Sequence, residues 1–296
     1  MRGYDRHPRG PRRSFLVACV ALGLLRATGS AAETLALDKD GGPKLSAEAV
    51  LVIDNESGKV LLARRANEVR SIASLTKLQA ALVFINRGIK LDQGTEINRE
   101  DWKTALDGCR TRLELKWTYS NRDLLHAALM ASDNRAVSAL GRAVGLHATG
   151  LVQAMNELAR RMGLSKTSFR GPVGIEHDNV STAWEISRIV RAAAKEPALS
   201  EPMSKKQYRV KPMRGYLKVW YRNTNPLVGT FKGADFLASK TGYNIKAGYC
   251  VASVAKLRGL GTLTIVLLGC KHKADRPADM RKIIRWLRSG GRQRSS

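Results

Sequence analysis

Residues 71–78 read SIASLTKL, and this stretch places a serine and a lysine three positions apart at the start of an apolar run that continues to Ile85. The run predicts a buried helix, and on a helix Ser74 and Lys77 share one face. A serine hydroxyl is a poor nucleophile at neutral pH and needs a base within hydrogen-bond reach, which Lys77 can supply. A position at the helix N-terminus also favours negative charge developing beside Ser74.

Two further triplets follow in chain order, Ser132-Asp133-Asn134 and Lys240-Thr241-Gly242. The first supplies a hydroxyl and an amide that can bridge a lysine to a substrate, and the second supplies a cation for a substrate carboxylate. We expect the second triplet to close a strand over Phe236–Ser239, with Gly242 letting a substrate backbone come close. Each triplet alone is common as a turn, a helix cap or a strand end. Their occurrence together, in this order, predicts a serine acyl-transfer site.

These motifs resemble those of low-molecular-mass penicillin-binding proteins, in the D-alanyl-D-alanine carboxypeptidase and endopeptidase family. The resemblance extends over about residues 47–287 and includes the segments Val52–Asp54, Gly58–Leu61, Leu124–Met130 and Ser181–Ala183. The segments more similar to the endopeptidase members are Asp133–Ala136, Arg222–Asn225 and Arg285–Leu287. The resemblance implies a hydrolase that cleaves after a D-alanine in peptidoglycan stem peptides and that β-lactam antibiotics inhibit covalently.

The resemblance also implies a role for each site residue. Ser74 is the expected nucleophile, Lys77 the favoured general base and Ser132 the relay of a proton to the leaving amine, although the sequence leaves the identity of the base open. Burial of Lys77 beside Lys240 would keep it neutral. The expected substrate-binding residues are Asn134, Lys240, Thr241, Gly242 and Tyr243. We expect the backbone N–H groups of Ser74 and Tyr243 to form the oxyanion hole.

Strand patterns near both ends of the chain enclose a mostly helical middle. We expect a hairpin over Ala47–Arg64, later strands at Phe236–Ser239, Tyr249–Lys256 and Leu263–Leu268, and helices at Asn121–Met130, Ala148–Met162, Thr182–Ala194 and about Pro277 to Arg288. With the resemblance, this predicts an α/β fold of the β-lactamase/transpeptidase type. Its antiparallel sheet, built from both termini and flanked by helices, would receive an inserted helical lobe. The sheet lobe would comprise about residues 45–87 and 234–288, and the helical lobe about 88–233.

Residues 1–32 have the pattern of a signal peptide. Arginines precede the apolar run Phe15–Leu25, and Ser30-Ala31-Ala32 supplies small residues at the cleavage spacing. Residues 33–296 would then form one serine peptidase domain in the periplasm or another extracytoplasmic space. Arg12-Arg13 leaves both the general secretory and the twin-arginine export routes open.

The chain has 51 Lys and Arg against 25 Asp and Glu, a net charge of +26. The leader holds six arginines and one aspartate, so the mature chain keeps 45 basic and 24 acidic residues, a net charge of +21. Such a charge favours peripheral association with an anionic membrane or wall surface. Nucleic acid is not an expected partner, because no binding motif occurs. After removal of Cys19, three cysteines remain, and we expect Cys250 and Cys270 to be buried and free.

Three alternatives to an endopeptidase share part of this sequence pattern. A carboxypeptidase releases free D-alanine instead of a second stem peptide, and that difference depends on cleft width, which no motif encodes. A class A β-lactamase needs a glutamate in a Glu-x-x-Leu-Asn segment, and Glu157, Glu176 and Glu185 lack this context. A non-catalytic cell-wall binding protein has no need of the complete motif set. No cofactor or metal ion is expected, because the spacing of His126, His147, His177 and His272 is not that of ligands.

Overall fold

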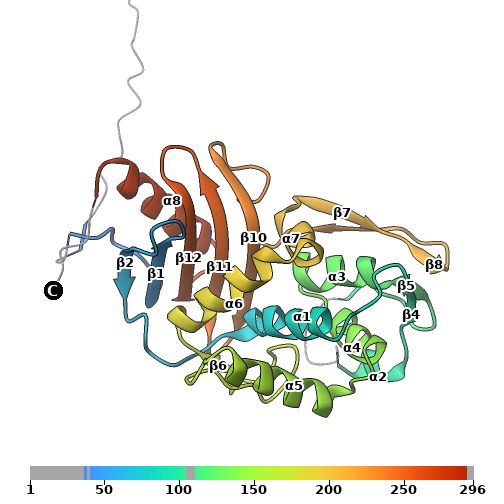
Figure 1. Ribbon diagram of the computed structural model, residues 1–296. Helices are drawn as coiled ribbons and strands as arrows, with labels where there is room; N and C mark the ends of the chain where they lie inside the picture. Colours follow the sequence, from blue (N-terminus) through green and yellow to red (C-terminus); the bar gives the residue numbers. More distant parts are fainter. Residues whose placement is uncertain (1–36, 39–40, 105–110, 292–296) are drawn as a thin grey trace, which may run out of the picture. The chain divides into compact units, whose positions relative to one another are not determined.

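The computed structural model describes residues 37–38, 41–104 and 111–291, and its largest sheet has five antiparallel strands (Figure 1). The strands are β1 (Ala49–Asp54), β2 (Val60–Arg64), β10 (Ala234–Asn244), β11 (Gly248–Leu257) and β12 (Gly261–Cys270). Their order across the sheet is β10-β11-β12-β1-β2, so β1 pairs with a strand from the far end of the chain. The predicted α/β fold, with an antiparallel sheet built from both termini, is confirmed.

Both faces of this sheet are buried, and the sequence of β1 shows how. Successive side chains of a strand point to opposite faces. Ala49, Leu51 and Ile53 join the core that contains α1 (Thr76–Asn86) and α6 (Ala183–Lys195). Val50 and Val52 join a second core, which includes the apolar side of α8 (Asp275–Arg288). Each of the buried Leu, Ile and Val side chains contributes about 1.5–3 kcal/mol to folding. The strand β1 therefore packs against helices on both faces of the sheet.

The middle of the chain is mostly helical, as predicted, and polar caps mark where helices begin. Ser120, Asp133 and Thr182 each accept a hydrogen bond from the backbone N–H three residues later. The helices in this region, besides α6, are α2 (Arg99–Lys103), α3 (Asn121–Met130), α4 (Asn134–Ala143), α5 (Ala148–Arg161) and α7 (Pro197–Ser204). The four helices predicted individually match α3, α5, α6 and α8, with ends that agree to within two residues.

Two boundaries beside the motifs differ from the prediction. Ser74 does not start α1 itself; it lies in a short 3-10 turn, η1 (Ala73–Leu75), that leads into the helix. Lys240-Thr241-Gly242 does not close a strand. β10 runs past the motif to Asn244, because its backbone stays paired with β11 as far as Asn244 opposite Gly248.

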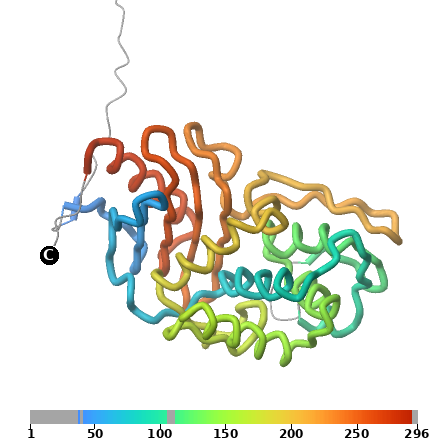
Figure 2. Tube along the Cα trace, viewed as in Figure 1, coloured from blue at the N-terminus to red at the C-terminus, as the bar shows by residue number. Residues whose placement is uncertain are grey.

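Short strands around the helices were not predicted. β4 (Gly94–Glu96), β5 (Thr118–Ser120) and β8 (Pro212–Arg214) form a three-stranded sheet, and β7 (Gln207–Val210) pairs with β9 (Val219–Arg222) in an antiparallel ribbon. β3 (Arg70–Ser71) and β6 (Val180–Ser181) make a third, small pair. The β7–β9 ribbon lies against α3, as the chain trace shows (Figure 2).

Cys250 and Cys270 are buried and free, as predicted. The predicted signal peptide and Cys109 lie outside the described residues. The boundaries assigned to the two lobes stay a prediction.

Candidate active site

The first motif brings Ser74 and Lys77 into direct contact. The Lys77 Nζ atom donates to Ser74 Oγ at 3.1 Å and to the Val173 carbonyl oxygen at 2.6 Å. The Lys77 side chain is only 1% exposed. The serine and the lysine predicted to act together are therefore held at hydrogen-bond distance in a site shielded from water.

A loop from the helical region holds this turn in place. Gly174 has a φ of +87°, and a Cβ atom there would lie 2.1 Å from the Ala73 carbonyl oxygen. The Asn179 side-chain amide donates to Thr76 Oγ1 at 3.0 Å and to the Gly171 carbonyl at 2.8 Å. Only a glycine fits at position 174, so the loop and the turn that carries Ser74 pack backbone against backbone.

The second motif joins α3 to α4 and leaves polar atoms without partners. Ser132 has a φ of +65°, a left-handed conformation that is rare for serine. Its buried Oγ atom has no hydrogen-bond partner among the described residues. Asn134 is fully buried, and neither amide atom of its side chain has a partner there. Native proteins rarely bury unpaired polar atoms, so unpaired atoms in a motif whose Ser132 lines a cleft indicate a ligand that completes their hydrogen bonds.

Asp133, between these two residues, stabilises the fold around the motif. Its carboxylate accepts from the Ala136 backbone N–H at 3.2 Å, which caps α4, and from the Tyr221 hydroxyl at 3.1 Å. Burial is the largest influence on this carboxyl and raises the pKa of Asp133 above its ordinary value. The middle residue of the motif therefore fixes α4 and the β7–β9 ribbon on either side of it.

The third motif lies in β10, an edge strand of the sheet. Lys240 is fully buried, and its Nζ atom donates to the Thr241 carbonyl oxygen at 2.8 Å. Thr241 Oγ1 donates to Thr224 Oγ1 at 2.7 Å. A Cβ atom at Gly242 would lie 2.9 Å from the Ile72 carbonyl oxygen and 3.1 Å from the Ser74 nitrogen. Gly242 was predicted to give a substrate room, but it is already required for β10 to approach the serine turn.

Five of the predicted residues line one cleft, with a volume of about 820 Å³: Ser74, Ser132, Thr241, Gly242 and Tyr243. The three other predicted site residues, Lys77, Asn134 and Lys240, are buried. The structure thus brings the three motifs together, from the serine turn, the α3–α4 junction and β10. The backbone N–H groups proposed for the oxyanion hole, of Ser74 and Tyr243, come from two segments that pack against each other through Gly242.

Other residues of the cleft were not assigned to the site from the sequence. Arg222, Asn223 and Thr224 form part of its wall, as do Tyr249, Lys273 and Arg276. Arg276, which is 7% exposed, comes from α8 and donates to the carbonyl oxygens of Gly242 at 3.5 Å and Cys250 at 3.3 Å. Burial lowers the pKa of this guanidinium from its ordinary value. A single arginine in a basic helix carries no local signal that sets it apart.

Comparison with known proteins decides the family. Residues 36–271 match Peptidase_S11, the D-alanyl-D-alanine carboxypeptidase family. The chain belongs to this family. It is therefore a serine hydrolase, a DD-peptidase of the penicillin-binding type.

Two relatives of this DD-peptidase match it over nearly their full length. The D-alanyl-D-alanine endopeptidase of Pseudomonas aeruginosa is 30% identical over 281 residues, which cover 94% of this chain and 90% of the relative. The D-alanyl-D-alanine endopeptidase of Escherichia coli is 26% identical over 280 residues, which cover 93% and 89%. Among solved structures, a Streptomyces DD-transpeptidase superposes with a TM-score of 0.75 at 24% identity, over 83% of this chain and 98% of the other. That likeness supports the fold.

The glutamates considered for a β-lactamase have other contacts in this DD-peptidase. Glu157 forms an ion pair with Arg160, and Glu185 accepts from the Lys166 backbone N–H and the Thr167 hydroxyl. The Glu176 carboxyl group lies against Gly171, at the position a Cβ atom there would take. Among the described residues, the Ser74 hydroxyl accepts from Lys77 and makes no hydrogen bond with any of these three carboxylates.

The described ranges contain neither a cluster of metal-ligating residues nor a helix suited to cross a bilayer. Residues 37–38, 41–104 and 111–291 contain no group of three or more His, Cys, Asp or Glu residues placed to hold a metal ion. Within the same ranges, no helix combines the length and the apolar character needed to cross a bilayer.

Proposed function

We propose that this DD-peptidase is a D-alanyl-D-alanine endopeptidase that hydrolyses the cross-link between two stem peptides of peptidoglycan. The observation that carries an acyl-transfer reaction is the bond from Lys77 to Ser74 together with the unpaired Oγ atom of Ser132, which lines the same cleft as Ser74. Both amide atoms of the buried Asn134, two residues further along the second motif, are also unpaired among the described residues. The choice of endopeptidase rests on the full-length similarity to two proteins of that name.

In the proposed reaction, Ser74 Oγ attacks the carbonyl carbon of the D-alanyl peptide bond while its proton passes to Lys77. The Lys77 Nζ atom lies 3.1 Å from Ser74 Oγ, close enough to take this proton directly. The backbone N–H groups of Ser74 and Tyr243 stabilise the oxyanion. The C–N bond then breaks, and the leaving amine takes the proton through Ser132. Water hydrolyses the resulting ester, which frees the shortened peptide and restores Ser74.

The other predicted residues orient the substrate in this proposal. The Asn134 amide, unpaired in the protein alone, bonds the substrate amide. Lys240 and Thr241 hold a substrate carboxylate, and the Thr224 hydroxyl, which accepts from Thr241, fixes the rotamer of that side chain. Arg276 adds a buried positive charge to the same wall of the cleft.

Mass spectrometry of defined wall fragments tests this proposal. Mature enzyme is incubated with a cross-linked dimer and a pentapeptide monomer together, and Ser74→Ala protein serves as control. We expect the dimer to split while the pentapeptide persists. Loss of D-alanine from the monomer with an intact dimer would instead make the protein a carboxypeptidase, the name that the family carries.

A penicillin experiment addresses the other two alternatives. We expect penicillin to add its mass to Ser74 and to remain attached, because Glu157, Glu176 and Glu185 lack the Glu-x-x-Leu-Asn context that supplies deacylating water in a class A β-lactamase. Rapid hydrolysis of penicillin would make the protein a β-lactamase. Absence of any adduct on folded protein would favour a non-catalytic binding protein.

Export of the chain is a further part of the proposal. Cleavage after Ala32 would release residues 33–296 outside the cytoplasm, where the net charge of +21 favours peripheral association with an anionic membrane or wall. The N-terminal sequence of the protein recovered from the periplasm checks this. An N-terminus that retains the arginines before Phe15 would contradict it.

A further inference from the structure

The β7–β9 ribbon has one buried and one exposed face. The antiparallel register places Arg209 opposite Trp220 and Gln207 opposite Arg222, so these four side chains share a face. All four are exposed, Trp220 by 52%. The Arg209 guanidinium carbon lies 5.7 Å from the centroid of the Trp220 ring. We name these four residues the outer ribbon face. Lys211 and Lys218, also exposed, follow at its far end.

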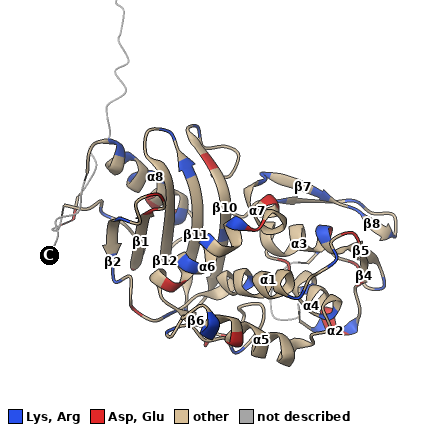
Figure 3. Ribbon diagram, in the orientation of Figure 1, with Lys and Arg blue, Asp and Glu red and all other residues tan. Residues whose placement is uncertain are grey.

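The charge of this region is entirely positive. From Pro202 to Ala234 the chain has no Asp or Glu, and it contains eight basic residues: Lys205, Lys206, Arg209, Lys211, Arg214, Lys218, Arg222 and Lys232. Lys205 forms an ion pair with Glu201, whereas Arg209, Lys218 and Arg222 form none with described residues. Basic positions lie along β7 and β8 in Figure 3. Unpaired cations on one face create a local positive potential that attracts anions.

The outer ribbon face is continuous with the catalytic cleft. Arg222 belongs to both, because it lines the cleft that contains Ser74 and Ser132. From Arg222 to Lys218 the chain advances four residues, or about 13 Å at the rise of a β-strand. A short extended peptide that leaves the cleft beside Arg222 is long enough to lie along this face.

The buried side of the ribbon is anchored to the site. Tyr221, between Trp220 and Arg222, donates its hydroxyl proton to Asp133 of the second motif. Tyr208 donates to Asp123 of α3 at 2.9 Å and stacks on the His126 ring, with centroids 3.6 Å apart. These contacts hold the exposed cations at a fixed position relative to Ser132, as a substrate subsite requires.

We propose that the outer ribbon face, with Lys218, is a subsite for an anionic, carboxylate-bearing peptide arm of a cross-linked substrate. Arginine presents a planar pair of donors that matches a carboxylate, and the Trp220 ring offers apolar contact beside it. The inference rests on the proposed endopeptidase function and deepens it: the second peptide of a cross-linked pair reaches the subsite, whereas penicillin or a monomer fills the cleft alone. The subsite thereby favours cross-linked over monomeric peptides.

Binding to inactive protein tests the subsite apart from catalysis. Arg209→Gln/Lys218→Gln is made in the Ser74→Ala background, and calorimetry measures the Kd for a cross-linked dimer and for a monomer. We expect the dimer Kd to rise about tenfold, since charge-assisted hydrogen bonds are lost, and the monomer Kd to stay unchanged. Added salt should weaken dimer binding to the protein that keeps Arg209 and Lys218, and so reduce the difference in dimer Kd between it and the double variant.

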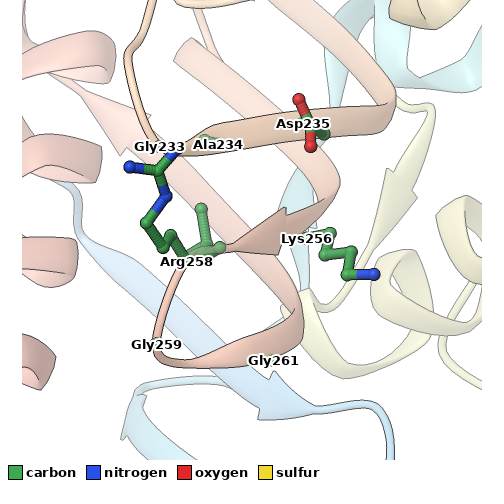
Figure 4. Close-up of a pocket in the computed structure, with 8 residues that line it drawn as sticks. Gly233, Ala234, Asp235, Lys256, Arg258, Gly259 and Gly261 are labelled. Carbon is green, nitrogen blue, oxygen red and sulfur yellow. The ribbon is translucent and has the colours of Figure 1, made fainter.

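A matched control is available at the other end of β10 and β11. Lys256 and Arg258 border a separate pocket of about 400 Å³ with Gly233, Asp235 and Gly261 (Figure 4). Both side chains are exposed, and the Arg258 contact to the Gly233 carbonyl oxygen is made by its backbone N–H. Lys256→Gln/Arg258→Gln removes the same two charges at a pocket that shares no residue with the catalytic cleft. It should therefore change neither the dimer Kd nor the monomer Kd.

The active enzyme supplies the second readout. Arg209→Gln/Lys218→Gln should raise the KM for the dimer and leave the rate of penicillin acylation as it was. The subsite is overturned if the dimer Kd does not change, if dimer and monomer lose affinity equally, or if the variant loses binding to anionic phospholipid vesicles alone. A dimer that binds through the ribbon yet is never cleaved would refute the endopeptidase proposal and retain the subsite. If the variant cleaves the dimer with an unchanged KM, the endopeptidase proposal stands and the subsite is overturned.

Discussion

The side chain of Asn134 is fully buried and unpaired, which is costly unless a substrate bonds it. An unsatisfied buried amide costs about 1–3 kcal/mol, and a substrate amide recovers that free energy on binding. We therefore expect Asn134→Ala to lower kcat/KM for the cross-linked dimer by about 10–100-fold. The free energy of unfolding should not fall, because no hydrogen bond of the protein alone is lost and an unpaired buried amide is removed. Steady-state kinetics and urea denaturation measure the two quantities.

Asn156 is the matched control for this prediction. Its amide accepts from the Phe169 N–H at 2.9 Å and donates to the Phe169 and Val152 carbonyl oxygens. Asn156→Ala should lower the free energy of unfolding by about 1–3 kcal/mol and leave kcat/KM of the folded enzyme unchanged. If both variants lost stability and kept activity, the binding role of Asn134 would be wrong.

Gly174 offers a second test at the residue scale. A Cβ atom there would overlap the Ala73 carbonyl oxygen, so Gly174→Ala must displace the turn that carries Ser74. A shift of about 1 Å in a reacting group can cost about a hundredfold in rate, and we expect a loss of that order in penicillin acylation. Stopped-flow mixing with a fluorescent penicillin measures the rate.

Gly88→Ala separates crowding from backbone strain. Gly88 also has a positive φ, +69°, but nothing lies within 4 Å of its Cβ position. This variant should lose about 1–2 kcal/mol of stability from backbone strain alone and should acylate normally. If Gly174→Ala and Gly88→Ala were acylated at the same rate, the contact at Gly174 would not be needed to position Ser74.

The sequence identified those site residues whose chemical type and spacing together indicate a reaction. Ser74 and Lys77 are informative because few structural needs place a serine and a lysine on one turn of a buried helix, and the structure brings them within 3.1 Å. Arg276 is equally close to the cleft, but an arginine suits any exposed helix, so its burial depends on the packing of α8 against β10 and β11. Gly174 was also missed, because its close neighbour lies about a hundred residues earlier in the chain.

At the scale of elements, the β7–β9 ribbon and α4 meet at Asp133, and pH reveals this contact. Burial raises the pKa of Asp133, while the hydrogen bond from Tyr221 opposes that rise. A carboxyl whose folded-state pKa is raised binds more protons when folded, so stability falls as pH rises through that window. Tyr221→Phe removes the donor and raises the pKa further. Near pH 4, where Asp133 approaches its neutral form, we expect this substitution to lower the free energy of unfolding by about 1 kcal/mol. The loss should be larger near pH 8, because an ionised carboxylate depends more on the lost donor.

Tyr119 is the control for the pH dependence. It is as buried as Tyr221, but its hydroxyl accepts a hydrogen bond from the Glu114 backbone N–H at 3.1 Å. Tyr119→Phe should destabilise by a similar amount at both pH values, because its partner does not titrate. Denaturant unfolding curves at the two pH values compare the variants, and parallel behaviour of both would contradict the Asp133 argument.

Elements with a strong apolar period or a polar cap were predictable from the sequence. β1 and β12 are nearly continuous apolar runs, and α3 and α6 each begin at a capping side chain. The ribbon was missed because β7 and β9 have only four residues each and carry polar or charged residues, Gln207, Arg209 and Arg222, on one face. The extension of β10 through Lys240-Thr241-Gly242 depends on its pairing with β11, which no local pattern encodes.

At the scale of the whole molecule, the site exists only because distant segments close around one sheet. The serine turn follows the first hairpin, the second motif lies between α3 and α4, and the third lies in β10, an edge strand. The order of strands and helices along the chain indicated a sheet built from both termini, and the family resemblance indicated that the motifs meet. The close fit between η1, Gly174 and Gly242 could come only from the folded structure.

Helix α8 connects the segment just before β1 to β10 and β11, through Asp279 and Arg276. The Asp279 carboxylate accepts from the backbone N–H groups of Ser46 and Ala47 at 2.8 and 2.9 Å, just before β1 begins. One turn earlier on the same helix, Arg276 bonds the backbone of β10 and β11. Loss of this carboxylate would leave two backbone donors unpaired, one of them on the buried Ala47.

We therefore expect Asp279→Ala to lower the free energy of unfolding by about 2–5 kcal/mol, since buried donors without partners are costly. Asp279→Asn should cost less, because an amide oxygen can still accept from both N–H groups. Burial raises the pKa of Asp279, so the folded state binds more protons and the parent protein loses stability as pH rises through that window. The asparagine variant should lack this slope. Unfolding curves across the acidic pH range measure this dependence. If the free energy of unfolding of Asp279→Asn falls with pH as steeply as that of the parent protein, another group causes the pH dependence.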